Sequence, residues 1–418
     1  MLVGALPVAL LAASPQRVTL SLAITAFYVV AAVFLVRRPS AADRPALIYA
    51  GIAILLIGLT LARMEWLDPL NSAQRAYGLA KGTYFLESVL PLAAAAALLV
   101  SRLDDLRPAV VVFLVIGLGT AAATLIVHNA ELFGVTRYTT QGNLVAMALL
   151  LVSQFWIIRN FRIGLGLLLV CFIALVITQS RQSAAAVAGG MLVTGVYWFA
   201  ADRVRAAAGT ASRLAKIWAV PAVGYGLLVV VVLVWAALIL QPWVHLPKEV
   251  KDPVTCNCIV GRFIDVTIRP GGRNVLIEQG WALFVSHPLI GAGLGSYVGL
   301  APYPYPHNIP LEVAGEMGVL GVLVLLVPLV VGWVRLALAG VKAASPAVAS
   351  AIIIVVMYFV VANLSGDLAS ERGLWVFGLV ILKLGWRRNP AEVAIGEGSP
   401  PPGEPASRAG RPPHVVGR

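Results

Sequence analysis

The stretch that sets the fold class is "YPYPHNIPLEVAGEMGVLG", residues 303–321, and the apolar run that it opens continues to residue 334. His307, Glu312 and Glu316 stand at the mouth of this run. A bilayer core about 30 Å thick takes about 20 apolar residues of helix, so the run predicts a transmembrane helix. Ionisable groups are costly at such a depth, and they therefore mark candidate functional residues.

The same apolar character extends over the whole chain. Of its 418 residues, 60% are hydrophobic and only 12% are charged, unlike a soluble globular domain. Segments long and apolar enough to span a bilayer lie at residues 18–36, 45–62, 84–101, 108–128, 144–158, 163–180, 183–201, 217–243, 309–334, 346–364 and 373–386. The opening "LVGALPVALLAAS" lacks the basic region of a cleaved secretory signal, and whether it spans is left open. We predict an all-α, polytopic integral membrane protein with 11–12 transmembrane helices.

Basic residues indicate the orientation of these spans, because cytoplasmic loops hold the excess of Lys and Arg. They gather in alternate connections, at Arg37 and Arg38, at Arg159 and Arg162, between residues 203 and 216, and after Lys383. We assign that side to the cytoplasm. The opposite, short outward loops hold little positive charge apart from Arg63, Arg75, Lys81, Arg137, Arg181 and Arg372. The net charge of +12 is then explained mainly by the basic cytoplasmic loops, which are attracted to anionic lipid head groups. We expect no nucleic-acid partner.

Four regions follow from this pattern: a transmembrane bundle over residues 1–243, an outward loop over 244–307, C-terminal transmembrane helices over 308–386 and a disordered cytoplasmic tail over 387–418. The loop is too long for an ordinary connection, which indicates a functional element.

Within this loop we expect an amphipathic helix from about Asn274 to Val285 that lies along the membrane surface. The turn "HPLIGAGLG" follows at residues 287–295. Its glycines resemble a dinucleotide fingerprint, but no βαβ unit surrounds them. We therefore expect a turn that packs closely on a helix.

Candidate chemistry lies on the outward face, with four arginines and one histidine: Arg181, Arg262, Arg269, Arg273 and His307. Arginine forks bind phosphate oxygens and stay charged, and a neutral histidine can accept a proton from a hydroxyl group. Together these residues could hold a diphosphate leaving group and activate an attacking alcohol. No spacing typical of a metal site occurs on this face, so we expect neither a metal nor another cofactor.

Simpler roles exist for several of these residues. Arginines at the ends of spans often only reach the lipid head groups, which applies above all to Arg181 and Arg262. Glu312 and Glu316 lie four residues apart on a helix and would repel each other if both were charged. We expect them to cap the helix, to pair with a loop arginine or to orient His307. Asn308 stands beside His307 at the helix start as a supporting residue.

Three blocks in a fixed order resemble a known family over about residues 165–334. They are "ALVITQSRQSAAA" at 174–186, "GRNVLIEQGWALFVSHPLIGAGLG" at 272–295 and "HNIPLEVAGEMGVLGVL" at 307–323. The first ends a span in Ser-Arg, the second leads from an arginine through a helix to a Pro-x-x-Gly-x-Gly turn, and the third joins His-Asn to Gly-x-x-Gly. This set resembles the O-antigen ligase and polysaccharide polymerase membrane proteins.

The resemblance implies an all-helical, GT-C-like glycosyltransferase architecture with a large periplasmic loop in the bacterial inner membrane. Members move a glycan from undecaprenyl diphosphate to a hydroxyl acceptor, which is lipid A core sugar, another lipid-linked glycan or a protein, and need no metal. By this resemblance Arg181 and Arg273 contact the diphosphate and His307 is the base. Arg262 and Arg269 precede the matched block, and we assign them as further ligands of the diphosphate. The chain departs from the family where Ile277 replaces the usual aromatic residue.

Other classes of function stay open at this point. A small-anion transporter would also use arginines, although it should place its site near the bilayer midplane in related halves. A non-catalytic component of a polysaccharide export complex is a further alternative. Within the enzyme class, the sequence does not separate ligase from polymerase.

Overall fold

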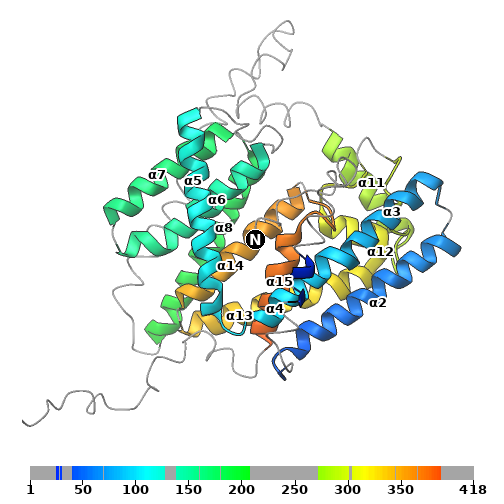
Figure 1. The fold of residues 1–418 in the computed structure, drawn as a ribbon, viewed down its shortest axis with the longest axis horizontal. Coiled ribbons are helices and arrows are strands. Elements are labelled where there is room, and N and C mark those ends of the chain that lie inside the picture. Colours follow the sequence, from blue (N-terminus) through cyan, green and yellow to red (C-terminus); the bar gives the residue numbers. More distant parts are fainter. Residues whose placement is uncertain are drawn as a thin grey trace, which may run out of the picture.

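The computed structural model describes residues 25–27, 29–30, 40–68, 70–127, 138–159, 161–178, 180–207, 272–300, 304–343, 345–364 and 366–386. Helices form the regular structure of this part of the chain, which confirms the predicted all-α class (Figure 1). Among these residues six helices are long and apolar enough to cross a membrane. The protein is therefore a polytopic membrane protein.

The first group of helices comprises α2 (Arg44–Trp66), α3 (Ser72–Tyr84), η3 (Phe85–Val89), α4 (Leu90–Leu99), η4 (Leu103–Leu106), α5 (Arg107–Val127), α6 (Tyr138–Arg159), α7 (Phe161–Thr178) and α8 (Arg181–Ala207). After a gap in the description come α11 (Gly272–Ser286), α12 (Ile309–Gly321), η7 (Val322–Leu326), α13 (Val327–Ala343), α14 (Pro346–Leu364) and α15 (Arg372–Gly385).

Each predicted span that lies within the described residues coincides with a helix. Most of span 18–36, all of span 217–243 and the tail 387–418 lie outside them. The span predicted at 84–101 starts earlier, because α3 runs into η3 and α4 as one helix from Ser72. A capping box at Asn71 and Gln74 fixes this start, since each side chain accepts a hydrogen bond from the other residue's backbone N–H.

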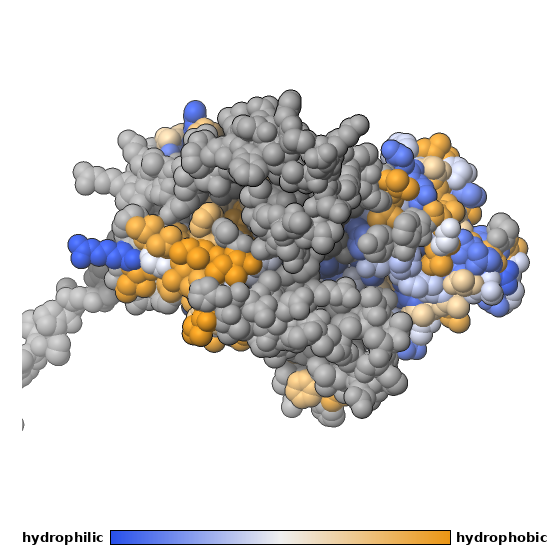
Figure 2. All heavy atoms as spheres, turned by 90° about the horizontal axis from the view of Figure 1, so that it is seen from above, coloured by the Kyte–Doolittle hydropathy of each residue, from blue (hydrophilic) through white to orange (hydrophobic). Residues whose placement is uncertain are grey.

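The helices pack around α15, which is buried along almost its whole length and contacts α4, α13 and α14. On one side α5, α6 and α7 pack together, and α8 joins them to α14. On the other side lie α2, α3, α11 and α12 (Figure 1). Figure 2 shows mostly apolar surface over the α5–α8 side, as lipid contact requires, and a mixture of hydrophilic and apolar residues at the opposite end.

Contacts between helix ends agree with the predicted alternation of direction. Lys383 Nζ lies 2.5 Å from the Asp43 carboxylate, and both belong to the predicted cytoplasmic side. At the other end Asn308 Nδ2 donates to the Asn363 carbonyl at 3.4 Å. Residues that were predicted to share one side of the membrane thus lie at one end of the bundle. Which end faces the cytoplasm stays a prediction.

The helix predicted at about Asn274–Val285 is confirmed as α11. Leu276 and Gly280 are buried, and Gly280 lies against Leu311 of α12. By contrast, the apolar Ile277 and Trp281 are 48% and 58% exposed. One face of α11 therefore packs on α12, and exposed apolar side chains lie on another face of the same helix. That α11 lies along the membrane surface stays a prediction.

Candidate functional site

The turn after α11 fills a break in α12. Gly318 has φ 69° and ψ −164° inside the helix, so the regular backbone ladder stops there. The freed carbonyls of Gly315 and Glu316 accept from the N–H groups of Ala292 and Gly293 at 2.9 and 3.0 Å. In return the N–H groups of Val319 and Leu320 donate to the carbonyls of Pro288 and Leu289 at 2.8 and 3.1 Å. These four hydrogen bonds give backbone groups on both sides of the break the partners that buried backbone needs.

Two glycines make this interlock possible. Gly291 has φ 70°, and a Cβ there would overlap the peptide between Glu316 and Met317. At Gly318, also with positive φ, a Cβ would overlap the carbonyl of Leu289. Both positions demand a left-handed backbone and close approach, which only glycine tolerates at low cost. The expected closely packed turn at 287–295 is confirmed, and it joins the second motif block to the third.

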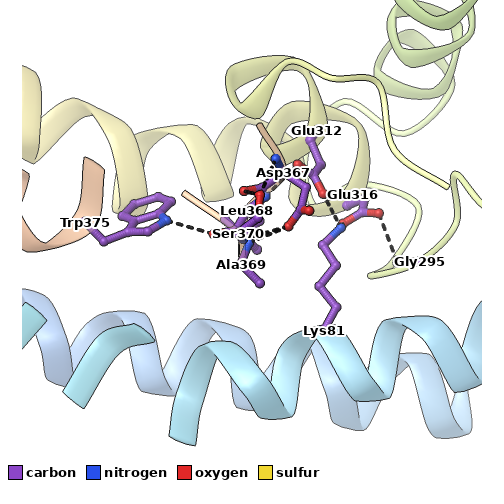
Figure 3. A network of polar contacts seen from close by, with 9 residues as sticks. All are labelled: Lys81, Gly295, Glu312, Glu316, Asp367, Leu368, Ala369, Ser370 and Trp375. Carbon is purple, nitrogen blue, oxygen red and sulfur yellow. Dashed lines mark hydrogen bonds and ion pairs between the residues drawn. The ribbon is translucent and has the colours of Figure 1, made fainter. Parts of the chain in front are cut away.

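A buried cluster of charges lies beside this interlock (Figure 3). Lys81 of α3 contacts the carboxylates of both Glu312 and Glu316, and its Nζ lies 2.5 Å from Glu316 Oε2. All three side chains are fully buried. Glu312 and Glu316 project from one face of α12, and the ammonium group between them offsets their mutual repulsion.

The cluster corrects one expectation from the sequence. Lys81 does not lie in an outward loop but within the continuous helix that begins at Ser72. Glu312 and Glu316 both pair with Lys81, a partner that the sequence did not suggest, and their expected roles toward a loop arginine or His307 stay predictions. Sequence reasoning missed Lys81 as a site residue, although a lysine followed at once by an apolar span is a signal of function. Its partner Glu316 stands 235 positions away, beyond the reach of local patterns.

Each glutamate also holds a loop through its second oxygen. Glu316 Oε1 accepts from the Gly295 N–H at 3.0 Å, and Glu312 Oε2 accepts from the Leu368 N–H at 2.8 Å. In the turn between α14 and α15, Asp367 Oδ1 accepts from the N–H groups of Ala369 and Ser370 at 2.8 and 2.9 Å. The cluster thus binds α3, α12 and two connecting turns together (Figure 3).

The same turn carries Glu371 next to α15. Burial, together with the smaller effect of the nearby charge of Asp367, raises the pKa of the Glu371 carboxyl group to about 8. The carboxyl group lies against Gly366, where a Cβ would overlap it. Glu371 therefore holds a proton over much of the physiological pH range.

His307 lies directly before the N-cap of α12 in a strained conformation. Its φ of 56° is in the left-handed region, where no other non-glycine residue of the described part lies. The Tyr305 ring packs edge-on against the His307 ring, with 4.5 Å between the ring centres. Asn308 is the N-cap of α12, and its side chain accepts from the Leu311 N–H at 2.9 Å. Asn308 thus supports the helix start, whereas strain at His307 is the kind of feature that concentrates at functional sites.

Helix register places the start of α11, with Arg273, at the same end of this helix pair as the start of α12. Gly280 lies against Leu311, and Gly315 against Leu283, so α11 and α12 run side by side in parallel. Two helical turns before the contact between Gly280 and Leu311, the first turn of α11 lies level with the residues just before α12. Arg273 and His307, separate in the second and third motif blocks, therefore belong to one end of the bundle.

Arg181, the first residue of α8, belongs to the same end. Gly189 of α8 lies against Val360 of α14, and further along Tyr197 Oη donates to the Ser345 carbonyl at 2.9 Å. The two helices are therefore antiparallel, and the start of α8 lies at the level where α14 ends. There Asn363 contacts Asn308, the neighbour of His307.

Buried polar side chains fix the start of α8. Ser183 Oγ donates to Asn143 Oδ1 of α6 at 2.7 Å and contacts Ser180 Oγ at 2.6 Å. Hydrogen bonds of this kind join helices within membranes, where few other partners exist. They anchor the motif that surrounds Arg181.

Two of the predicted diphosphate ligands, Arg262 and Arg269, lie outside the described residues. In the part that is described, no group of three or more His, Cys, Asp or Glu side chains is arranged to hold a metal ion. Independence from a metal remains a prediction.

Comparison with known proteins supports the resemblance. A family model described as O-antigen ligase matches residues 165–326, which include the motif residues Arg181, Arg273 and His307. This confirms the resemblance to the O-antigen ligase and polymerase family over that part of the chain. No curated protein matches the sequence. The family implies lipid-linked glycan substrates and a glycosyl-transferring reaction in a membrane.

Proposed function

We propose, from the match of residues 165–326 to the O-antigen ligase family, that the chain is a membrane glycosyltransferase. It moves a glycan from an undecaprenyl-diphosphate-linked donor to a hydroxyl group of lipid A core sugar or of a second lipid-linked glycan. The reaction takes place on the periplasmic face of the bacterial inner membrane and needs no metal. The observation that supports the proposal most is that three helix starts, at residues 181, 272 and 309, lie at one end of the bundle.

In this mechanism His307 acts as the base. Its neutral imidazole accepts the proton of the acceptor hydroxyl as the oxygen attacks the anomeric carbon, and the bond from that carbon to the diphosphate oxygen breaks. Arg181 and Arg273, joined by Arg262 and Arg269 from the outward loop, bind the diphosphate and stabilise the charge on the departing oxygens. The strained backbone at His307 supports a site whose geometry is fixed before substrate binds.

The experiment measures glycan transfer by the purified full-length protein in lipid, with a chelator present. The donor is an undecaprenyl-diphosphate-linked oligosaccharide, given with and without lipid A core. Chain growth with donor alone identifies a polymerase, and product only with the core identifies a ligase. No product from folded protein under either condition contradicts the proposal.

Variants assign the roles of the residues. His307→Ala should slow transfer by roughly 10²–10⁴-fold, the usual contribution of a general base. His287→Ala is the matched control, because this exposed histidine lies in the turn after α11 and contacts Ser286 at 2.9 Å. Arg181→Ala and Arg273→Ala should raise the donor concentration needed for half-maximal rate. If both arginine variants are silent, a non-catalytic scaffold explains the protein better.

One observation favours a second candidate, a small-anion transporter. α12 breaks at Gly318 inside a candidate span, next to buried charges, and broken helices form ion sites in transporters. Here, however, the turn at residues 288–293 pairs with the four backbone groups that the break frees, so they do not face a substrate. Uptake of labelled bicarbonate or phosphate into proteoliposomes without any lipid-linked glycan would support transport instead.

A further inference from the structure

Lys81 occupies a central position in the described part of the chain. Its ammonium group contacts Glu312 and Glu316, and these carboxylates in turn accept the N–H groups of Leu368 and Gly295. One buried cation therefore connects α3, α12, the turn after α11 and the turn between α14 and α15 (Figure 3).

These segments are the ones that carry or flank the proposed site. His307 precedes the N-cap of α12, and Glu312 lies in the first turn of that helix. The turn at Gly295 continues from α11, whose first turn holds Arg273. Lys81 lies in neither region, but it contacts Glu312 of α12 directly and is connected to the turn at Gly295 through Glu316.

Stability alone does not account for such an arrangement. A buried ion triad often contributes little net stability, because desolvation of the charges offsets their attraction. Removing only the cation is different, since two carboxylates four residues apart on one helix then repel in a medium of low dielectric constant. They would have to bind protons or move apart, and both turns would lose a charged anchor.

We infer that Lys81 is a positioning residue for the proposed transfer. By holding Glu312 and Glu316 together, it fixes the start of α12 and the turn after α11 relative to each other, and so sets the distance between His307 and the arginines. The inference rests on the proposed function. It adds a residue outside the matched family segment, because the match begins at residue 165.

The test compares variants of the full-length protein in lipid. Lys81→Met leaves two unpaired carboxylates, whereas the triple variant Lys81→Met, Glu312→Gln, Glu316→Gln removes every charge of the cluster and should still fold. Lys383→Met is the matched control, since Lys383 is equally buried and lies 2.5 Å from Asp43, at the other end of the bundle. Lys81→Arg keeps the positive charge.

We expect both Lys81→Met and the triple variant to lower kcat ten- to hundred-fold, because displacement of a catalytic group by about 1 Å has an effect of this size. Lys383→Met should keep kcat within about twofold, and Lys81→Arg should recover part of the loss. Amide hydrogen exchange of residues 288–295 and 307–311 should rise in the Lys81 variants but not in Lys383→Met.

Three other outcomes would overturn the inference or the proposed function. If His307→Ala is inactive but the triple variant transfers at the wild-type kcat, Lys81 only fills space, and the inference is overturned while the proposed function stands. An equal loss of kcat in Lys383→Met would show a general effect of instability and overturn the inference too. A wild-type protein that transfers nothing overturns the proposed function, and the inference with it.

Discussion

The carbonyl of Pro288 accepts a 2.8 Å hydrogen bond from the Val319 N–H, which joins the turn after α11 to the break in α12. Three further backbone hydrogen bonds complete the interlock. It ties the second and third motif blocks together, and so couples the helix that carries Arg273 to the helix that follows His307. Testable predictions start from this interlock and from the groups around it.

Gly291→Ala should destabilise the protein. A left-handed backbone costs a non-glycine residue about 1–2 kcal/mol, and the added Cβ would also overlap the peptide after Glu316. Thermal unfolding of the purified protein in lipid measures the effect. Gly58→Ala in α2 is the control, because no neighbouring atom lies within 4 Å of a Cβ there, and it should be neutral or slightly stabilising. Equal unfolding temperatures for both variants would contradict the prediction.

Arg63→Ala should loosen the turn at residues 288–293. Arg63 Nη1 donates to the Ile290 carbonyl at 2.7 Å and Nη2 to the Gly291 carbonyl at 3.1 Å. Hydrogen bonds from a charged group contribute about 1.5–3 kcal/mol each. Amide exchange at Ala292 and Gly293 should therefore accelerate. Arg107→Ala, whose ion pair with Asp104 is exposed, should leave this exchange unchanged, and the same acceleration there would count against the assignment.

His307→Gly should unfold at a higher temperature than His307→Ala. Glycine adopts the φ of 56° without the penalty of about 1–2 kcal/mol that alanine carries. Neither variant has an imidazole, so neither should transfer glycan at more than about 1% of the wild-type rate if the ring is the base. Thermal unfolding and the transfer assay, run on the same preparations, separate strain from chemistry. A His307→Gly protein with full activity would exclude the base role.

Asn308→Ala should lower stability more than activity. Its side chain caps α12, and loss of an N-cap costs about 0.5–2 kcal/mol. Asn308→Asp keeps an oxygen that can accept from the Leu311 N–H and should recover most of this loss. Unfolding temperature and kcat are compared for both variants. A large fall in kcat that Asp does not restore would instead indicate contact with substrate.

Glu371 should make the protein less stable as the pH rises. Burial raises its pKa to about 8 from a usual 4.5, so between these values the folded chain holds a proton that the unfolded chain has released. Each rise in pH then favours unfolding, until the effect levels off above pH 8. Unfolding temperatures between pH 5 and 8 should fall less steeply for Glu371→Gln than for wild type. The exposed Glu65→Gln serves as control, and identical slopes for all three proteins would refute the prediction.

Hydropathy predicted most of the fold, because each span is a local property of about 20 consecutive residues. The helix at 346–364 was predicted with its observed bounds, and α11 to within two residues at its start. The start of α3 was missed, since polar residues such as Gln74 and Arg75 hide the first three turns from a hydropathy window. Capping at Asn71, rather than apolar content, decides where that helix begins.

For the candidate site, the sequence alone predicted His307, Arg181 and Arg273 from chemistry and motif, and it determined that the protein is a polytopic helical membrane protein. It did not determine the partner of Glu312 and Glu316. That pairing depends on which helix packs against α12, and Lys81 comes within 2.5 Å of Glu316 only because α3 does so. Tertiary structure also decided that the glycine turn would enter the break in α12, since a backbone hydrogen bond such as that between Pro288 and Val319 cannot be predicted from the pattern of side chains. The hydrophobicity of a residue follows from its type alone, so it can be read from the sequence. The partner of a buried charge or of a freed backbone group depends on which residue the fold places next to it.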